Sequence, residues 1–224
     1  IPHHMVGVAD PRFPYSAARF VEEATACTDE ILARGKLPVV VGGTGLYLDA
    51  LVAGRRFAGG EAGGEIREKL KARLEAGGIE PLYQELAEID PAAAARLHLA
   101  DVKRILRALE IYYETGETIT AHDARERALP PRYEATYLGL TFEDRTDLRA
   151  LIDRRVDQMM EQGLVEELRA LLERGVPRDS TALQAIGYKE LLSALDGLRP
   201  LEEAVAEIKL RSHQYAKRQL TWLR

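Results

Sequence analysis

The feature that most constrains the fold is a short apolar run between an amphipathic segment and a cluster of glycines. Residues 16–34 place apolar side chains at helical spacing, with Ser16 as the expected N-cap and Gly35 as the expected stop. Residues 37–41, Leu-Pro-Val-Val-Val, have the unbroken β-branched character of a strand buried on both faces. Gly-Gly-Thr-Gly and a further helical pattern follow. This order predicts an α/β unit with a parallel sheet.

Two breaks divide the chain into a core and an insertion. Residues 54–65 contain five glycines, and two consecutive prolines follow at 130 and 131. We expect residues 54–131 to form an all-helical insertion domain, because no run between the breaks resembles a strand. Its helical patterns cover residues 66–76, 81–88, 91–97 and 102–115.

The remaining residues, 1–53 and 132–224, are expected to form the α/β core. Residues 137–142 have strand character, and a long amphipathic helix is expected over 201–220. Two strands are too few for a stable open sheet, since sheets usually have about four to six. We therefore expect further strands upstream of Ile1.

Composition excludes several classes of protein. The 224 residues are 46% hydrophobic and 30% charged, as in folded globular proteins and unlike disordered chains. Cys27 is the only cysteine, which excludes an intrachain disulfide and suits the reducing cytoplasm, where we expect the protein. Neither a membrane span nor a metal site held by histidines is indicated. The formal net charge is −5, so any nucleic-acid site must be local.

The glycine cluster is the first candidate site. It consists of Gly42, Gly43, Thr44 and Gly45, which follow the predicted strand directly. Glycines at the carboxyl end of a strand let backbone amides approach an anion, and the next helix start favours negative charge. The alternative is that these glycines only make a tight turn.

Cationic side chains form three further candidates. Lys103, Arg104 and Arg107 share one side of a predicted helix, which suits phosphate contacts, although they could instead pair with nearby glutamates. Arg155, beside Arg154, could clamp a phosphate or pair with a neighbouring aspartate.

The carboxyl end of the chain is the most basic segment. Five basic residues accompany one acid there, and Tyr215 and Trp222 lie among them. Aromatic and guanidinium groups together are the surfaces on which unpaired bases stack. The alternative is that Trp222 belongs to the core and that the cations complete a helix end.

Five segments, read together along the whole chain, resemble the bacterial tRNA dimethylallyltransferases, also called tRNA isopentenyltransferases. They are VVVGGTGLYLDAL from Val39, VKRILRALEIYYETGETIT from Val102, DRRVDQMMEQGLVEE from Asp153, ALQAIGYKEL from Ala182 and AKRQLTWLR from Ala216. Five ordered segments are far more specific than any one of them.

The resemblance implies transfer of a dimethylallyl group from dimethylallyl diphosphate to the exocyclic amine N6 of the adenosine just 3′ of the anticodon in tRNA. It implies a P-loop NTPase-like, nucleotide- and ATP-binding core whose helical insertion, residues 54–131, grips the anticodon stem. The adenosine would be extruded from its stack to reach the donor. Mg²⁺, bound with the diphosphate, is the implied cofactor. The implied partners are the tRNA anticodon stem-loop and the prenyl donor, and we expect a monomer.

The resemblance also assigns roles to residues of this sequence. Thr44 would face the tRNA nucleotide at the reaction centre, in a channel lined by Gly42, Gly43 and Gly45. Arg155 would lie near the leaving diphosphate, where a planar cation stabilises the developing charge. The other expected tRNA contacts are Arg67, Lys103, Arg104, Ile105, Leu106, Arg107, Gln184, Ala185, Ile186, Gly187, Tyr188, Lys189, Lys217, Arg218, Gln219, Leu220, Thr221, Trp222, Leu223 and Arg224.

This sequence departs from the family pattern in two ways. Leu151 stands where the family usually has an arginine, four residues before Arg155. The family's P-loop and the aspartate proposed as general base lie upstream of Ile1, so the chain as given is expected to be inactive.

Two other functions stay open. An adenylate isopentenyltransferase of cytokinin synthesis uses a free nucleotide and needs no anticodon-binding insertion. A non-catalytic RNA-binding fragment would bind tRNA without transferring the prenyl group.

Overall fold

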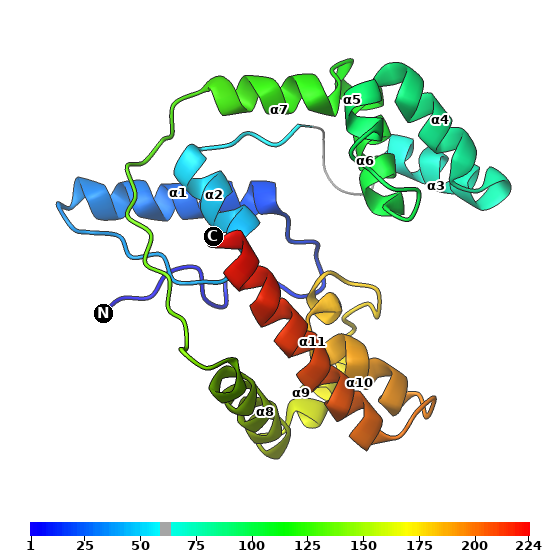
Figure 1. Cartoon of the computed structure of the whole chain (residues 1–224). Coiled ribbons are helices and arrows are strands. Elements are labelled where there is room, and N and C mark those ends of the chain that lie inside the picture. Colours follow the sequence, from blue (N-terminus) through cyan, green and yellow to red (C-terminus); the bar gives the residue numbers. More distant parts are fainter. Residues whose placement is uncertain (59–63) are drawn as a thin grey trace. The chain divides into compact units, whose positions relative to one another are not determined.

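The computed structural model describes residues 1–58 and 64–224, and every regular element in these residues is a helix (Figure 1). The first half of the chain contains α1 (Ala17–Ala33), α2 (Gly45–Ala53), α3 (Glu65–Gly77), α4 (Glu80–Ile89), α5 (Pro91–Ala94), α6 (Val102–Thr115) and α7 (Ile119–Ala128). The second half contains α8 (Arg145–Glu161), α9 (Leu164–Glu173), the 3-10 helix η1 (Ala182–Gln184), α10 (Tyr188–Leu195) and α11 (Leu201–Trp222). No helix of the described residues combines the length and the apolar character that a bilayer crossing requires.

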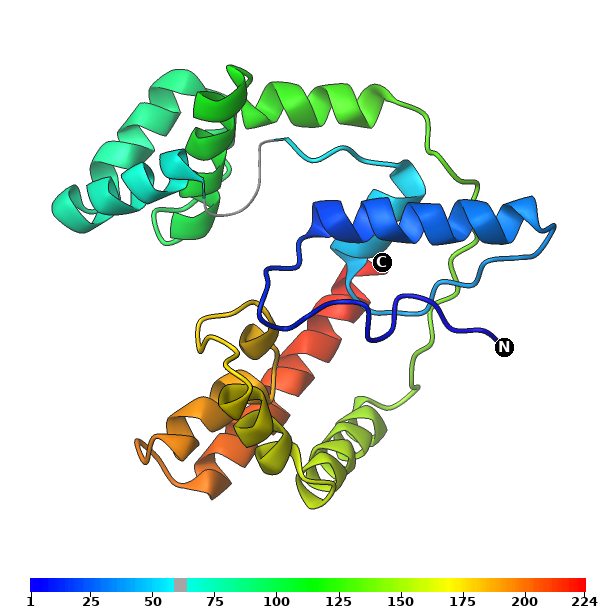
Figure 2. The same ribbon diagram turned by 180° about the vertical axis from the view of Figure 1, so that it is seen from behind.

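The chain forms two compact units. The first comprises Ile1–Tyr15, Glu22–Asp49 and Ala135–Arg224. Its core lies among α8, α9, α10 and α11, and α11 packs against both α8 and α10 (Figures 1 and 2). The core residues are Val156, Leu164, Val165, Leu168, Val176, Leu183, Leu191, Ala204 and Ile208. This core fixes the long helix α11, which carries most of the basic carboxyl segment.

The second unit comprises Ser16–Val21 and Ala50–Glu134. Its core lies among α3, α4, α5 and α6. The core residues are Leu70, Leu82, Leu86, Ala93, Ala94, Ile105, Ala108 and Leu109. The assignment of residues 54–131 to tRNA binding stays a prediction. The expected break at 54–65 lies partly outside the described residues.

Local signals in the sequence place the helix ends. The Ser16 side chain accepts a hydrogen bond from the backbone N–H of Arg19 at 3.2 Å, as predicted for an N-cap. Gly35 follows α1 with a φ of +65°, a conformation that few other residues adopt. Thr118 caps α7, a helix that the apolar pattern did not reveal because most of its surface is polar. The predicted helix over 102–115 is confirmed as α6.

The predicted fold class, an α/β P-loop-like core with a parallel sheet, is wrong for the described residues. Residues 37–41 and 137–142 have no regular structure. Val39 and Val41 are 76% and 90% exposed, and Leu138 and Leu140 are 88% and 93% exposed. A β-branched run gives a preference for extended backbone, but a strand also needs a neighbour that pairs with its N–H and C=O groups. Neither run has such a neighbour within residues 1–58 and 64–224.

Candidate functional site

The glycine turn and α11 meet in the first unit. The hydroxyl oxygens of Thr44 and Tyr215 lie 3.2 Å apart and share a hydrogen bond. The Thr44 carbonyl accepts hydrogen bonds from the N–H groups of Tyr47 and Leu48, so this residue begins α2. The Thr44 side chain is exposed. Its hydroxyl can therefore reach a ligand while Tyr215 holds it.

At two positions of the turn only glycine fits, because side chains of α11 lie too close for a Cβ atom. A Cβ atom on Gly45 would collide with the indole ring of Trp222, and one on Gly43 would collide with the side-chain amide of Gln219. A Cβ atom on Gly42 would meet open space. None of the three has the positive φ at which glycine is favoured in turns of types II, I′ and II′. The structure thus favours close approach over the alternative of a simple tight turn.

One face of α11 makes these contacts. Tyr215, Gln219 and Trp222 follow the i, i+4, i+7 spacing that aligns side chains along a helix. Trp222 is 37% exposed and lies over the turn, so it is not a core residue. This spacing places the three side chains on one face of α11 but does not indicate which segment that face contacts, so the sequence did not reveal the contact between Thr44 and Tyr215.

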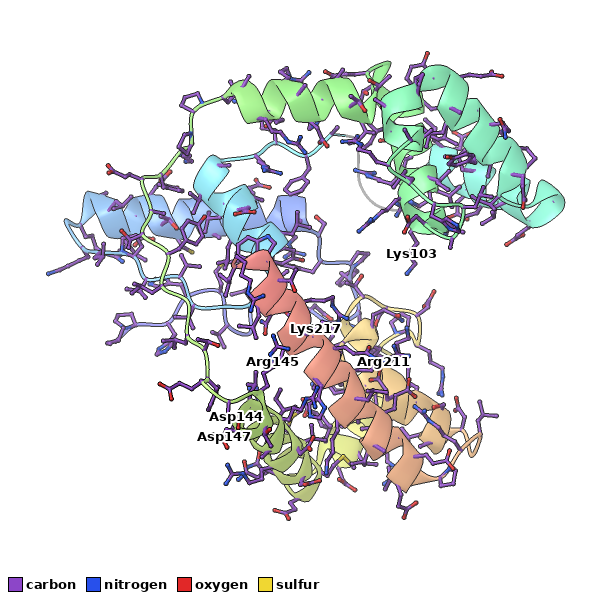
Figure 3. The ribbon with its side chains drawn as sticks, viewed as in Figure 1. Lys103, Asp144, Arg145, Asp147, Arg211 and Lys217 are labelled. Carbon is purple, nitrogen blue, oxygen red and sulfur yellow. The ribbon has the colours of Figure 1, made fainter. Side chains whose placement is uncertain are left out.

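Two basic side chains near the end of α11 stay available around this contact. Lys217 and Arg218 are exposed, and Lys217 projects from α11 in Figure 3. The Arg218 guanidinium lies 5.7 Å from the centroid of the Tyr215 ring, within range of a cation–π interaction. No acid pairs with either cation in the described part of the chain. Leu223 and Arg224 complete the exposed end, with Thr221 before them and Leu220 half-buried.

Arg155 lies on α8 with its charge unpaired. Of the two aspartates that could have neutralised it, Asp157 is paired with Lys209 of α11, and Asp153 lies close to His213 of α11 without forming a hydrogen bond. Asp153 Oδ1 lies 2.9 Å from Nε2 of His213, and Asp157 Oδ1 lies 2.6 Å from Nζ of Lys209. Arg155 therefore has no ion pair within residues 1–58 and 64–224, contrary to the surface-pair alternative. No spacing in the sequence indicated that α11 would approach these two aspartates.

The predicted tRNA contacts of the second unit fall into two groups. Arg67 and Arg107 lie 2.9 Å and 2.7 Å from the same oxygen of Glu110, which is 1% exposed. This ion pairing matches the alternative in which Arg107 pairs with a glutamate. Lys103 and Arg104 are exposed and have no partner among the described residues.

Two apolar residues of the same segment contribute to the structure of the unit. Ile105 is fully buried in the core, and Leu106 packs against that core. Their direct contact with tRNA stays a prediction, whereas their packing explains why Lys103 and Arg104 are turned outward.

The segment 184–189 joins η1 to α10 in the first unit. Gly187 has a φ of +110°, and its N–H donates to Glu190 Oε2 at 2.8 Å. The Tyr188 hydroxyl donates to Glu167 Oε1 at 2.7 Å, and burial together with this glutamate raises the pKa of Tyr188 to about 12. Gln184, Ala185 and Lys189 are exposed, and Ile186 is half-buried.

The described residues contain no group of three or more His, Cys, Asp or Glu side chains that could hold a metal ion. Mg²⁺ often takes several of its ligands from substrate phosphates and water. These residues therefore do not form a Mg²⁺ site by themselves.

Comparison with known proteins decides the family. The family model described as IPP transferase matches residues 1–224. The chain belongs to the IPP transferase family. The tRNA dimethylallyltransferase of Thermomicrobium roseum is 45% identical over 224 residues, covering 100% of this chain and 67% of the relative. That of Halalkalibacterium halodurans is 44% identical, covering 100% of this IPP transferase and 71% of the relative.

Solved structures agree. A crystal structure of the full-length tRNA isopentenylpyrophosphate transferase from Bacillus halodurans matches with a TM-score of 0.66 and 41% identity, covering 100% of this chain and 68% of that one. The structure of a eukaryotic dimethylallyltransferase acting on tRNA matches with a TM-score of 0.75 and 30% identity. The match covers 100% of this chain and 56% of that one. The family and the enzyme class predicted from the sequence, a prenyltransferase, are confirmed.

Proposed function

We propose that this IPP transferase moves a dimethylallyl group from dimethylallyl diphosphate to N6 of the adenosine 3′ of the anticodon in tRNA. The observation that carries the proposal is the contact between the glycine turn and α11. It joins an exposed hydroxyl, Thr44, to an aromatic and cationic helix face in one unit. The full-length similarity to tRNA dimethylallyltransferases supports the same reaction.

The chemistry requires one bond to form and one to break. N6 attacks C1 of the dimethylallyl group, the C1–O bond breaks, and its electron pair leaves with the diphosphate. The amine loses a proton to a general base. The acceptor base must first leave its stack, because N6 is not accessible to the donor within stacked RNA.

Three parts of the chain have proposed roles in this reaction. The Thr44 hydroxyl, held by Tyr215, contacts the extruded adenosine. Lys217, Arg218 and the exposed end of α11 bind the surrounding anticodon loop, since unpaired cations next to aromatic rings suit single-stranded RNA. Arg155 stabilises the negative charge that develops on the leaving diphosphate. Its unpaired guanidinium supports this role, because an arginine already neutralised by Asp153 or Asp157 would offer less charge.

The insertion, residues 54–131, is proposed to hold the anticodon stem through Lys103 and Arg104. Both cations are exposed on α6 and have no partner in the described part of the chain. Mg²⁺ as cofactor, a monomeric state and a cytoplasmic location stay predictions.

The test is a transfer assay with the full product of the gene that encodes this chain. Labelled dimethylallyl diphosphate is offered with tRNA, with AMP, or with tRNA whose adenosine 3′ of the anticodon is replaced by guanosine. We expect label only in the tRNA that keeps its adenosine 3′ of the anticodon, and only on that adenosine. Transfer to AMP alone would support an adenylate isopentenyltransferase, and tRNA binding without transfer would support an RNA-binding protein without catalysis.

A further inference from the structure

Helix α8 carries two consecutive arginines, of which only the second has a role in the proposed reaction. Arg154 and Arg155 are both exposed, and neither has a hydrogen bond or an ion pair within residues 1–58 and 64–224. Two unpaired guanidinium groups on neighbouring residues repel each other. An anion between the two groups removes this repulsion, and the leaving diphosphate is the anion that the proposed reaction supplies.

The two side chains cover the same turn of α8. Long side chains of a helix lean toward its N-terminus and lie over the residues three and four positions earlier. Leu151 is three residues before Arg154 and four before Arg155, so this geometry places both arginines over it. Leu151 is 44% exposed, and its apolar surface packs against arginine methylene groups without adding charge. The two guanidinium groups therefore share one uncharged turn.

The acid that would neutralise Arg154 within α8 is paired with another helix. Among the residues three and four positions from Arg154, Asp157 is the only acid, and this spacing favours an ion pair along a helix. Asp157 Oδ1 lies instead 2.6 Å from Nζ of Lys209. Lys209 belongs to α11, which packs against α8 (Figures 1 and 2). This contact between helices leaves the charge of Arg154 available to a ligand.

We propose that Arg154 is a second contact to the leaving diphosphate and binds it together with Arg155. The inference rests on the proposed function, which places Arg155 at the diphosphate. Arg154 also covers the turn of Leu151, where the resemblance leads one to expect a second arginine. Guanidinium groups suit the task because they donate two parallel hydrogen bonds to phosphate oxygens. As the C1–O bond breaks and its electron pair stays with the diphosphate, both cations stabilise the added charge.

Lys209 then acts as a positioning residue. It touches no substrate in this proposal and acts only through Asp157. By holding that carboxylate, it prevents an ion pair between Asp157 and Arg154.

Arg154→Gln tests the proposal, and Arg149→Gln is its matched control. Arg149 is also an exposed arginine of α8 without a partner in the described part of the chain. Five residues of helix turn it about 140° away from Arg154. The inhibition constant of inorganic diphosphate and the KM for dimethylallyl diphosphate are measured in the full gene product at constant ionic strength. Arg154→Gln should raise both constants about tenfold, because it loses one charge-assisted contact, and Arg149→Gln should match the parent.

Two double variants separate a contact with diphosphate from a structural role. Leu151→Arg in the Arg154→Gln background returns a guanidinium group to the same turn and should recover most of the lost inhibition. Lys209→Gln alone releases Asp157 to pair with Arg154 and should weaken inhibition by diphosphate about twofold. Adding Asp157→Asn removes the released carboxylate and should restore the inhibition constant of the parent. Neither recovery is expected if the single variants merely disturb folding.

The outcomes distinguish this inference from the proposed function. Inhibition constants that are the same in the parent and in Arg154→Gln, in an enzyme that still prenylates tRNA, would overturn the inference and leave the function in place. Equal losses in Arg154→Gln and Arg149→Gln would also overturn it, because the effect would then come from net charge. A higher KM for tRNA with unchanged inhibition by diphosphate would assign Arg154 to the RNA instead. A parent that neither transfers the prenyl group nor binds diphosphate would contradict the proposed function and the inference together.

Discussion

Substituting the glycines of the turn one at a time should give a graded series of effects on α11. At Gly45, the new methyl group would overlap the rigid indole ring of Trp222. Overpacking of this kind costs about 1 to 3 kcal/mol, and replacing glycine by alanine in a helix returns up to about 1 kcal/mol. Gly45→Ala should therefore destabilise this contact by about 0 to 3 kcal/mol, with about 1.5 kcal/mol at the centre of that range. It should displace the end of α11 from the turn and separate Tyr215 from Thr44.

The same substitution at the two preceding glycines provides the controls. At Gly43, the methyl group meets only the far end of the Gln219 side chain, which can rotate away, so Gly43→Ala should cost less. At Gly42, it meets open space, and Gly42→Ala should be neutral or stabilise by about 0.4 to 1 kcal/mol.

The fluorescence of Trp222 reports the outcome directly, because it is the only tryptophan in the chain. We expect Gly45→Ala to shift the emission to longer wavelength and to increase quenching by acrylamide, with Gly42→Ala unchanged. Transfer activity should fall in the same order as the fluorescence changes. Identical emission and quenching in the parent and in Gly45→Ala would refute the packing argument.

Three further predictions concern charge and ionisation. Joint replacement of Lys103 and Arg104 by alanine should lower the salt slope of stem-loop binding by about 1.4 to 1.8, with the ion-paired Lys69→Ala as control; an unchanged slope would remove both from the interface. Arg155→Ala should lower turnover and leave tRNA affinity nearly intact, and a loss of affinity with normal turnover of the bound complex would contradict its role. Because the pKa of Tyr188 is raised to about 12, its contribution to stability is complete below its usual pKa of 10.0 and disappears as the pH rises through about 12. In an ultraviolet pH titration, Tyr188→Phe should lose one phenol that ionises near pH 12. Loss of a phenol that ionises near pH 10.0 instead would contradict the assignment.

The sequence predicted the helices better than the sheet for a physical reason. A helix forms all its backbone hydrogen bonds within one segment, so a local apolar pattern is enough to predict it. The bounds of α6 were therefore predicted correctly. The runs at 37–41 and 137–142 carried only a preference for extended backbone, and a strand depends on a partner elsewhere. Helix α7 was missed because its apolar stripe is weak.

The candidate site was predictable in its residue types and not in its pairings. Motifs indicated Thr44 and Arg155 as site residues. No local pattern showed that Tyr215 would share a hydrogen bond with Thr44. Nor did any pattern show that α11 would approach Asp153 and Asp157, the aspartates beside Arg155. Contacts between segments far apart in the sequence depend on packing, which spacing within one segment does not encode.

Photochemical cross-linking tests the central claim most directly. An anticodon stem-loop with a photoreactive adenosine analogue 3′ of the anticodon is bound to the full gene product and irradiated, and the adducts are mapped by mass spectrometry. The account predicts adducts in residues 42–45 and on the Tyr215–Trp222 face of α11, reduced in Gly45→Ala. Adducts confined to other segments, with none on the turn or on α11, would contradict it.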